Sequence, residues 1–208
     1  MKSVGLREEQ KAGRRQSILE IARVKFESEK YADVTIEAIA AEAKLSPVTV
    51  YNYFGNKAGL LLALVSESDE LLIAQLEAMI REDPGDLIES VAWFGQILRQ
   101  HAMSYLSKQT WREVLAASIQ FGSQDFGRSY AELDQVLIEL MGSLIENLQS
   151  NGLLAKNIDR AALANTLFSL QNIRFFQFIA DDNISNEMID RTFRADLAGL
   201  AKAFGAPT

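Results

Sequence analysis

Cysteine is absent from this 208-residue sequence, histidine occurs once and proline only three times. Without thiols there are no disulfide bonds and no thiolate metal sites, and a reducing, cytoplasmic location is consistent with that absence. No uncharged apolar stretch reaches the length of about 18 residues that a membrane-spanning helix needs. The polar N-terminus also lacks the apolar segment of a secretory signal, so we expect no membrane partner.

Charge is distributed unevenly along the chain. The formal net charge is -7, yet residues 1–60 hold ten Lys or Arg against eight Asp or Glu, a net charge of +2. The rest of the chain carries a net charge of -9. A mildly basic first part on an acidic remainder is the asymmetry expected when only one end of a protein meets phosphate groups.

Apolar residues recur with a helical period through most of the chain, whereas the alternating pattern of strands is scarce. We therefore predict an all-α fold, with a core that the 48% apolar composition can fill. Pro84-Gly85 is the clearest linker signal. The predicted helices cover about residues 14–29, 36–43, 47–54, 57–81, 87–107, 109–122, 127–150, 159–181 and 186–204.

Two short helices near the N-terminus follow a longer one. Thr35 is placed to cap the first short helix and Ser46 the second, with Pro47 at a first helical position where a missing N–H costs nothing. A tight turn at Lys44-Leu45 separates them. Such a pair, about residues 35–54, predicts a helix-turn-helix whose second helix enters the major groove of double-stranded DNA.

The side chains of the second short helix suit contact with DNA. Thr49 offers a hydroxyl and a methyl group, and Tyr51 and Tyr53 can donate phenolic hydrogen bonds to phosphate. Lys57 begins the next helix, where its charge and nearby backbone N–H groups suit a phosphate. Each such residue taken alone is more often a plain surface or half-buried residue, so the prediction rests on the joint pattern.

The run TIEAIAAEAKLSPVTVYNYFGNKAGL, residues 35–60, resembles the signature of the TetR family of transcriptional regulators. In that signature a Ser or Thr opens the recognition helix, followed by Thr-x-Tyr-x-Tyr/His-Phe-x-x-Lys-x-x-Leu. The resemblance covers about residues 13–65 and includes the upstream helix and Tyr31. The family usually has glycine where this chain has Lys30 and Lys44. It usually has a small residue in place of Val48 and an acidic residue in place of Gly59. A left-handed Lys44 would cost about 1 kcal/mol relative to Gly.

The resemblance implies a three-helix DNA-binding head over residues 1–60, followed by a helical bundle over residues 61–208 that dimerises and binds a ligand. Arg14 and Arg15 of the N-terminal arm either add DNA contacts or form a solvated basic patch. The DNA-binding residues that it implies are Thr35 toward a phosphate, Ser46 at the helix start, Pro47, Val48, Thr49 and Asn52 toward base edges, and Tyr51, Tyr53 and Lys57 toward phosphates.

The last two predicted helices are strongly apolar. Large apolar residues surround the helix at 159–181 almost completely and form a stripe along the helix at 186–204. A helix that is apolar on more than one face must bury more than one face. These helices therefore form either a homodimer interface or plain core. The predicted interface residues are Leu163, Leu167, Leu170, Phe193, Leu197 and Leu200.

The middle helices are rich in large side chains, which line a cavity for a small effector or belong to the core. The predicted ligand-binding residues are Trp93, Phe94, Met103, Trp111, Phe121 and Phe126. We expect His101, which lies mid-helix, to be exposed or to cap rather than to touch a ligand. No cofactor and no metal ion is predicted.

The predicted function is a sequence-specific DNA-binding regulator of transcription, a repressor released from a palindromic operator by a small apolar or amphipathic effector. The alternative is a TetR-like DNA-binding activator or nucleoid-associated protein that a partner controls. An enzyme is disfavoured, because the sequence lacks a G-x-S-x-G elbow, a glycine-rich phosphate loop and an H-E-x-x-H motif. A single histidine also cannot supply the two Glu-x-x-His pairs of a di-iron bundle.

Overall fold

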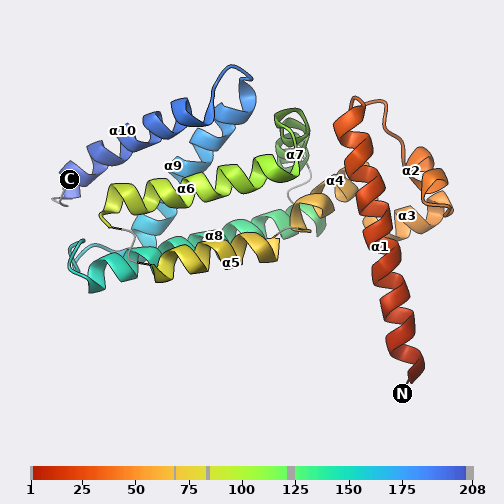
Figure 1. Cartoon of the computed structure of the whole chain (residues 1–208), viewed down its shortest axis with the longest axis horizontal. Coiled ribbons are helices and arrows are strands. Elements are labelled where there is room, and N and C mark those ends of the chain that lie inside the picture. Colours follow the sequence, from red (N-terminus) through yellow and green to blue (C-terminus); the bar gives the residue numbers. More distant parts are fainter. Residues whose placement is uncertain (1, 68, 83–84, 121–124, 205–208) are drawn as a thin grey trace. The chain divides into compact units, whose positions relative to one another are not determined.

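The computed structural model describes residues 2–67, 69–82, 85–120 and 125–204, and every regular element in these ranges is an α-helix (Figure 1). The prediction of an all-α fold is confirmed. Within the same ranges no helix is long and apolar enough to cross a membrane. The chain divides into two compact units, residues 1–67 with 109–130 and residues 68–108 with 131–208, which we call the first and second unit.

The first unit packs four consecutive helices around a small apolar core. They are α1 (Lys2–Ser28), α2 (Ile36–Glu42), α3 (Pro47–Phe54) and α4 (Lys57–Ser66), and α7 (Lys108–Gln120) joins them from residue 109 onward. Leu19 of α1, Ile39 of α2, Phe54 of α3 and Leu60 of α4 are among its fully or almost fully buried side chains. Thr110 fixes α7 to the end of α1, because its hydroxyl donates to the Phe26 carbonyl oxygen at 3.2 Å.

Two predicted helix boundaries in this part of the chain are wrong. The first helix begins at Lys2 rather than near residue 14, since residues 2–13 hold no proline and are mostly good helix formers. The single helix predicted over residues 57–81 is two helices, because α4 ends at Ser66 and α5 begins at Asp69. The residues between the two helices are polar, which suits helix ends. Asp69 and Glu70 occupy the first turn of α5, where carboxylates are favoured.

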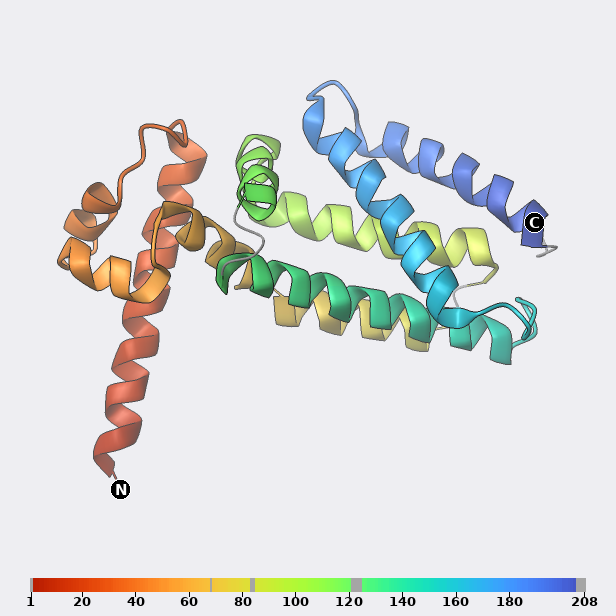
Figure 2. The same cartoon turned by 180° about the vertical axis from the view of Figure 1, so that it is seen from behind.

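The second unit is a bundle built around one apolar cluster. Its helices are α5 (Asp69–Arg81), α6 (Leu87–Tyr105), α8 (Asp125–Ser150, from residue 131 onward), α9 (Arg160–Ala180) and α10 (Asn186–Phe204). Leu76, Phe94, Leu144, Leu167 and Phe193 each bring a fully buried side chain to this cluster, one from each helix. Figure 2 shows α9 crossing α6 obliquely, so both helices reach the shared core.

Charged side chains connect α6, α9 and α10 over this core. The buried Arg99 donates from Nη2 to Oδ1 of Asp190 at 2.9 Å, and Arg194 donates from Nε to the other oxygen at 2.7 Å. Arg174 of α9 binds both carboxylate oxygens of Asp196 at 2.6 and 2.8 Å. These ion pairs orient α10, because a fork of two parallel hydrogen bonds holds direction as well as distance.

Candidate nucleic-acid interface

The helix-turn-helix begins with a capped helix and a tight turn. The Thr35 hydroxyl accepts from the Ala38 N–H at 3.1 Å and so caps α2. At its other end, the Leu45 N–H donates to the Ala40 carbonyl at 2.9 Å and the Lys44 N–H donates to Ala41 at 3.1 Å. This pair of bonds is a Schellman motif, which requires a left-handed residue, and Lys44 has a φ of 55°. The expected left-handed turn is therefore present without its usual glycine.

Helix α3 has one anchored face and one exposed face. Val50 and Phe54 are buried in the core of the first unit. Val48 is 64% exposed and Tyr51 42% exposed, and Asn52 is exposed beside them. Apolar and aromatic side chains that remain in solvent on a short rigid helix indicate a contact surface rather than a packing requirement. The exposed face therefore contains three of the residues that the sequence assigned to DNA.

The start of α3 is held by its own side chains. The Ser46 hydroxyl accepts from the Thr49 N–H at 3.2 Å, and the two hydroxyl oxygens of Ser46 and Thr49 lie 2.9 Å apart. Pro47 occupies the first turn and is half-buried, as is Thr49. These contacts fix the N-terminal turn, which is the part of a recognition helix that approaches base edges.

The two tyrosines of α3 have different partners. The Tyr51 hydroxyl donates to Oε1 of Glu37 on α2 at 3.4 Å, a long and exposed contact that a stronger acceptor can displace. The half-buried Tyr53 donates to the Lys11 carbonyl oxygen at 3.3 Å and so connects α3 with the N-terminal part of α1. Tyr51 is thus the more available of the two for a phosphate.

Gly55 sets the direction of the chain between α3 and α4. Its φ of 72° and ψ of -50° form a γ-turn, with the Asn56 N–H donating to the Phe54 carbonyl at 2.8 Å. Asn56 then caps α4 by accepting from the Gly59 N–H at 2.8 Å. A side chain at Gly55 would strain this turn, so the glycine is needed to lead the chain from the recognition helix back into the core.

Lys57 lies against protein oxygen atoms. Its Nζ donates to the carbonyls of Tyr31, Ala32 and Val34 at 2.5, 3.4 and 2.8 Å and lies 4.3 Å from the centre of the Tyr31 ring. An ammonium group has three N–H donors, and these three carbonyls can occupy all of them. In this conformation Lys57 holds the loop before α2 in place, and its predicted phosphate contact remains a prediction.

The long helix α1 carries basic residues in the same unit as α3. Lys11 and Arg14 are exposed, whereas Arg15 lies with its guanidinium carbon 5.7 Å from the centre of the Phe54 ring. Sequence reasoning placed Arg14 and Arg15 in an N-terminal arm, at the start of the helix predicted over residues 14–29, whereas both lie well inside α1. The lack of proline before residue 14 was the available signal, because Gly5 and Gly13 weaken a helix without ending it.

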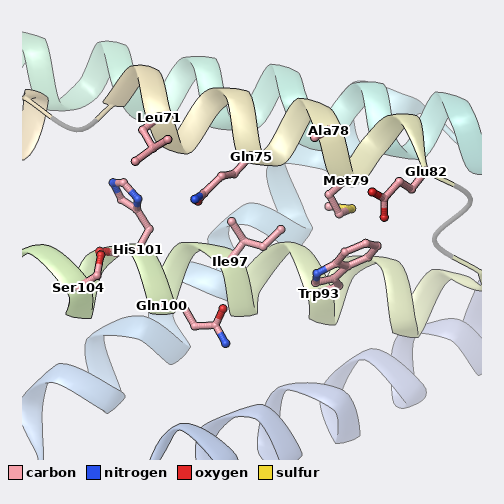
Figure 3. A pocket seen from close by; sticks show the side chains of 10 residues that line it. All are labelled: Leu71, Gln75, Ala78, Met79, Glu82, Trp93, Ile97, Gln100, His101 and Ser104. Carbon is pink, nitrogen blue, oxygen red and sulfur yellow. The ribbon is translucent and has the colours of Figure 1, made fainter.

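The predicted ligand-binding residues do not form one site. Trp93 lines a pocket of about 470 Å³ between α5 and α6, which Figure 3 shows. Phe94 instead lies in the core of the second unit, and Trp111 is buried in the first unit. Met103 is half-buried on α6 and outside the lining of this pocket. Phe121 and the side chain of Phe126 lie outside the described residues.

His101 is a pocket-lining residue that sequence reasoning did not identify as one. It is half-buried rather than exposed, and its ring lies in the same pocket as Trp93 (Figure 3). Burial lowers its pKa from 6.5, so the imidazole is neutral at pH 7. Its position at i+8 from Trp93, two helical turns away on one face of α6, was the signal in the sequence.

The predicted interface residues lie mostly inside the chain's own core. Leu163, Leu167, Phe193 and Leu197 are at most 4% exposed, and Leu170 and Leu200 pack against the same cluster. Side chains buried in this way offer little surface to a second chain. Among the described side chains of these two helices, the large apolar ones that remain exposed are Ile173, Phe176 and Met188.

Comparisons with known proteins agree with this site. Residues 18–64 match the family description "Bacterial regulatory proteins, tetR family". No curated protein matches the chain. These residues span the last part of α1, all of α2 and α3, with its exposed face, and most of α4.

Solved structures share the fold over nearly the whole chain. A TetR-family transcriptional regulator from Pectobacterium atrosepticum has a TM-score of 0.69 at 24% identity, with 95% of this chain and 96% of that chain covered. A regulator described as a putative TetR-family member from Mesorhizobium loti has a TM-score of 0.67 at 17% identity, with 92% of this chain and 96% of that chain covered. SmeT in a complex with triclosan has a TM-score of 0.61 at 19% identity, with 91% of each chain covered.

The fold and the helix-turn-helix define a DNA-binding regulator of transcription. Residues 18–64, which contain this helix-turn-helix, match the tetR family of bacterial regulatory proteins.

Proposed function

We propose that this protein represses transcription by binding a palindromic operator as a homodimer, and that a small amphipathic effector releases it. The observation that carries the DNA contact is the outward face of α3, where Val48 and Tyr51 stay exposed while Val50 and Phe54 anchor the helix. The family match of residues 18–64 supports the same reading. In this proposal residues 1–60 form the DNA-binding domain and residues 61–208 the ligand-binding and dimerisation domain.

The proposed contacts divide between base edges and phosphates. Val48 and Asn52 read base edges, because a valine methyl group packs on a thymine methyl and an amide pairs with adenine. Pro47 and Thr49 bring the helix start close to the groove. Tyr51 donates to a phosphate, and Thr35 and Ser46 place helix N-termini toward the backbone. Tyr53 and Lys57 hold the surrounding loops and add phosphate contacts only if their present hydrogen bonds open.

A homodimer is proposed because one short helix reads too few base pairs for useful affinity, and two copies read two half-sites. We assign the interface to the exposed faces of α9 and α10 rather than to their buried leucines. Ile173 is 48% and Phe176 39% exposed on α9, and they lie three residues apart on one face. Ile173→Asp should therefore produce a monomer in sedimentation experiments. Ile119→Asp, at a 79% exposed site on α7, is the control that should leave the dimer intact.

The test of DNA recognition is selection of bound sequences from a random DNA pool by the full-length protein, repeated at two salt concentrations. We expect a single palindromic sequence and an affinity that falls steeply with salt. Asn52→Ala should weaken binding to that sequence about tenfold and relax the base preference at one position of each half-site. The control is Asn157→Ala at an exposed site of the second unit, which should bind like the wild type.

Recovery of many dispersed sequences without a palindrome would favour the nucleoid-associated alternative. Absence of any binding to duplex DNA at low salt would overturn the proposal altogether.

The regulatory step is tested separately with reporter transcription from the selected sequence. Repression without effector, and its loss when the effector is added, is the expected result. Activation by the bound protein would contradict the repressor assignment while leaving the DNA contacts intact.

A further inference from the structure

The pocket between α5 and α6 lies entirely within the second unit and has a volume of about 470 Å³. Figure 3 shows its walls, in which every lining residue comes from one of these two helices or from the residue that follows α5. The lining residues are Leu71, Gln75, Ala78, Met79, Glu82, Trp93, Ile97, Gln100, His101 and Ser104. About half of them are apolar, which suits a ligand with an apolar body and a polar end.

The charge of this lining has one sign. Among the described residues neither lysine nor arginine lines the pocket, and Glu82 is the one acidic residue in the lining. His101 adds no positive charge there, because burial lowers its pKa from 6.5. An anionic ligand would therefore lose hydration without gaining a cation as a partner.

The two ends of the pocket differ in chemistry. Trp93, Met79 and Glu82 gather at one end, and His101 and Leu71 face each other at the other end (Figure 3). An indole ring and a carboxylate at the same end of a pocket favour an organic ammonium group there, because the aromatic quadrupole and the negative charge both attract it. The opposite end is less polar, since Leu71 is apolar and Nε2 of His101 is shielded from solvent.

We propose that this pocket binds an amphipathic organic cation, with its ammonium group between Glu82 and the Trp93 indole and its apolar body between α5 and α6. The inference rests on the proposed function for its regulatory meaning, since there the ligand is the effector. Binding itself can be measured without DNA.

The test uses three probes with the same phenylbutyl body and different end groups: 4-phenylbutylamine, 4-phenylbutanol and 4-phenylbutyrate. Calorimetry on the full-length protein at pH 7 should show the amine binding about tenfold more tightly than the alcohol, and no saturable binding of the acid. Trp93 provides a second readout in a Trp111→Phe background, because its fluorescence should change with the amine. Trp111 is buried in the first unit and outside this pocket.

Two variants of α5 and its following residue separate the pocket carboxylate from general surface charge. Glu82→Gln should reduce amine affinity about fivefold and leave alcohol affinity unchanged, because only the charge is lost. Glu77→Gln is the matched control, since Glu77 pairs with Arg81 at the surface and does not line the pocket. Trp93→Leu should weaken the amine more than the alcohol, because leucine keeps apolar contact and lacks the aromatic face.

Equal affinity for the amine and the alcohol, tighter binding of the acid, or an equal effect of the two glutamine variants would overturn the proposal. Operator affinity measured without any probe reports on the proposed function independently. Amine binding that leaves operator affinity unchanged would keep the ligand class and reject the effector role. Normal operator binding without amine binding would reject the ligand class alone.

Discussion

The helix-turn-helix and helix α10 are held by polar side chains that act over very different distances in sequence. In the first unit Thr35, Ser46 and Asn56 each cap a helix by accepting from an N–H three residues later. In the second unit Arg174 and Asp196 pair across 22 positions and Arg99 and Asp190 across 91. The comparison teaches that the helix-turn-helix is specified locally, whereas α10 is placed by contacts that exist only once the bundle has formed.

The largest expected effect comes from removing one of the long-range ion pairs of the second unit. Asp190→Ala removes the carboxylate that faces the 1% exposed Arg99, leaving a buried guanidinium without its counter-charge. Thermal or denaturant unfolding should show a loss of about 3 kcal/mol. The double variant Arg99→Met with Asp190→Ala should recover most of the loss, because an apolar side chain of similar length needs no partner. A double variant as unstable as the single one would show that the charge is not the cause.

A smaller effect concerns Asp134, a partly buried carboxyl group of the second unit. Burial raises the pKa of Asp134 from 3.8 to about 6, so the folded state binds its proton more tightly than the unfolded chain. Stability is therefore lost as the pH rises through the range from about 4 to 6. Asp134→Asn should stabilise the protein by about 1 kcal/mol at pH 7.5, after allowance for its partial exposure, and by nothing at pH 4.

The matched control for this experiment is Glu132→Gln, because Glu132 is an exposed carboxylate on the same helix. Unfolding curves at both pH values should coincide with those of the wild type. A stabilisation by Asp134→Asn that is equal at pH 4 and pH 7.5 would mean that packing, not ionisation, is responsible.

The next prediction concerns the turn between α2 and α3, which is specified locally. Lys44→Gly should stabilise the protein by roughly 0.5–1 kcal/mol, because glycine adopts the φ of 55° without strain. Lys30→Gly is the control. Lys30 also stands where the family usually has glycine, yet among the described non-glycine residues only Lys44 has a positive φ. Equal stabilisation by both substitutions, measured by chemical unfolding, would refute the strain at Lys44.

The smallest expected effect lies on the exposed face of the first unit. Glu37→Gln should tighten binding to duplex DNA about twofold at low salt, because it removes a negative charge that lies beside the Tyr51 hydroxyl. The gain should disappear at high salt, where exposed charges are screened. Glu139→Gln on α8 is the control, and a gain that persists at high salt would point to a changed structure instead.

Most of the fold and the DNA-binding face could be predicted because their signals are short-range. Helix caps, Pro47 and the aromatic run after Ser46 lie within one or two turns of each other, so their spacing is visible in the sequence. The break between α4 and α5 was missed because both sides read as one apolar helix, and helix ends depend on packing as well as propensity. Lys57 was assigned to phosphate because the carbonyls it contacts lie 23 to 26 residues earlier.

By itself the sequence determined an all-α chain whose second short helix is amphipathic, since helical period and capping are properties of neighbouring residues. The tertiary structure decided which apolar residues are core, which remain exposed on α9 and α10, and which line the pocket. His101 and Leu71 approach each other only when α5 packs on α6. Whether a side chain is buried depends on which residues from elsewhere in the chain pack against it, and no local pattern contains that information.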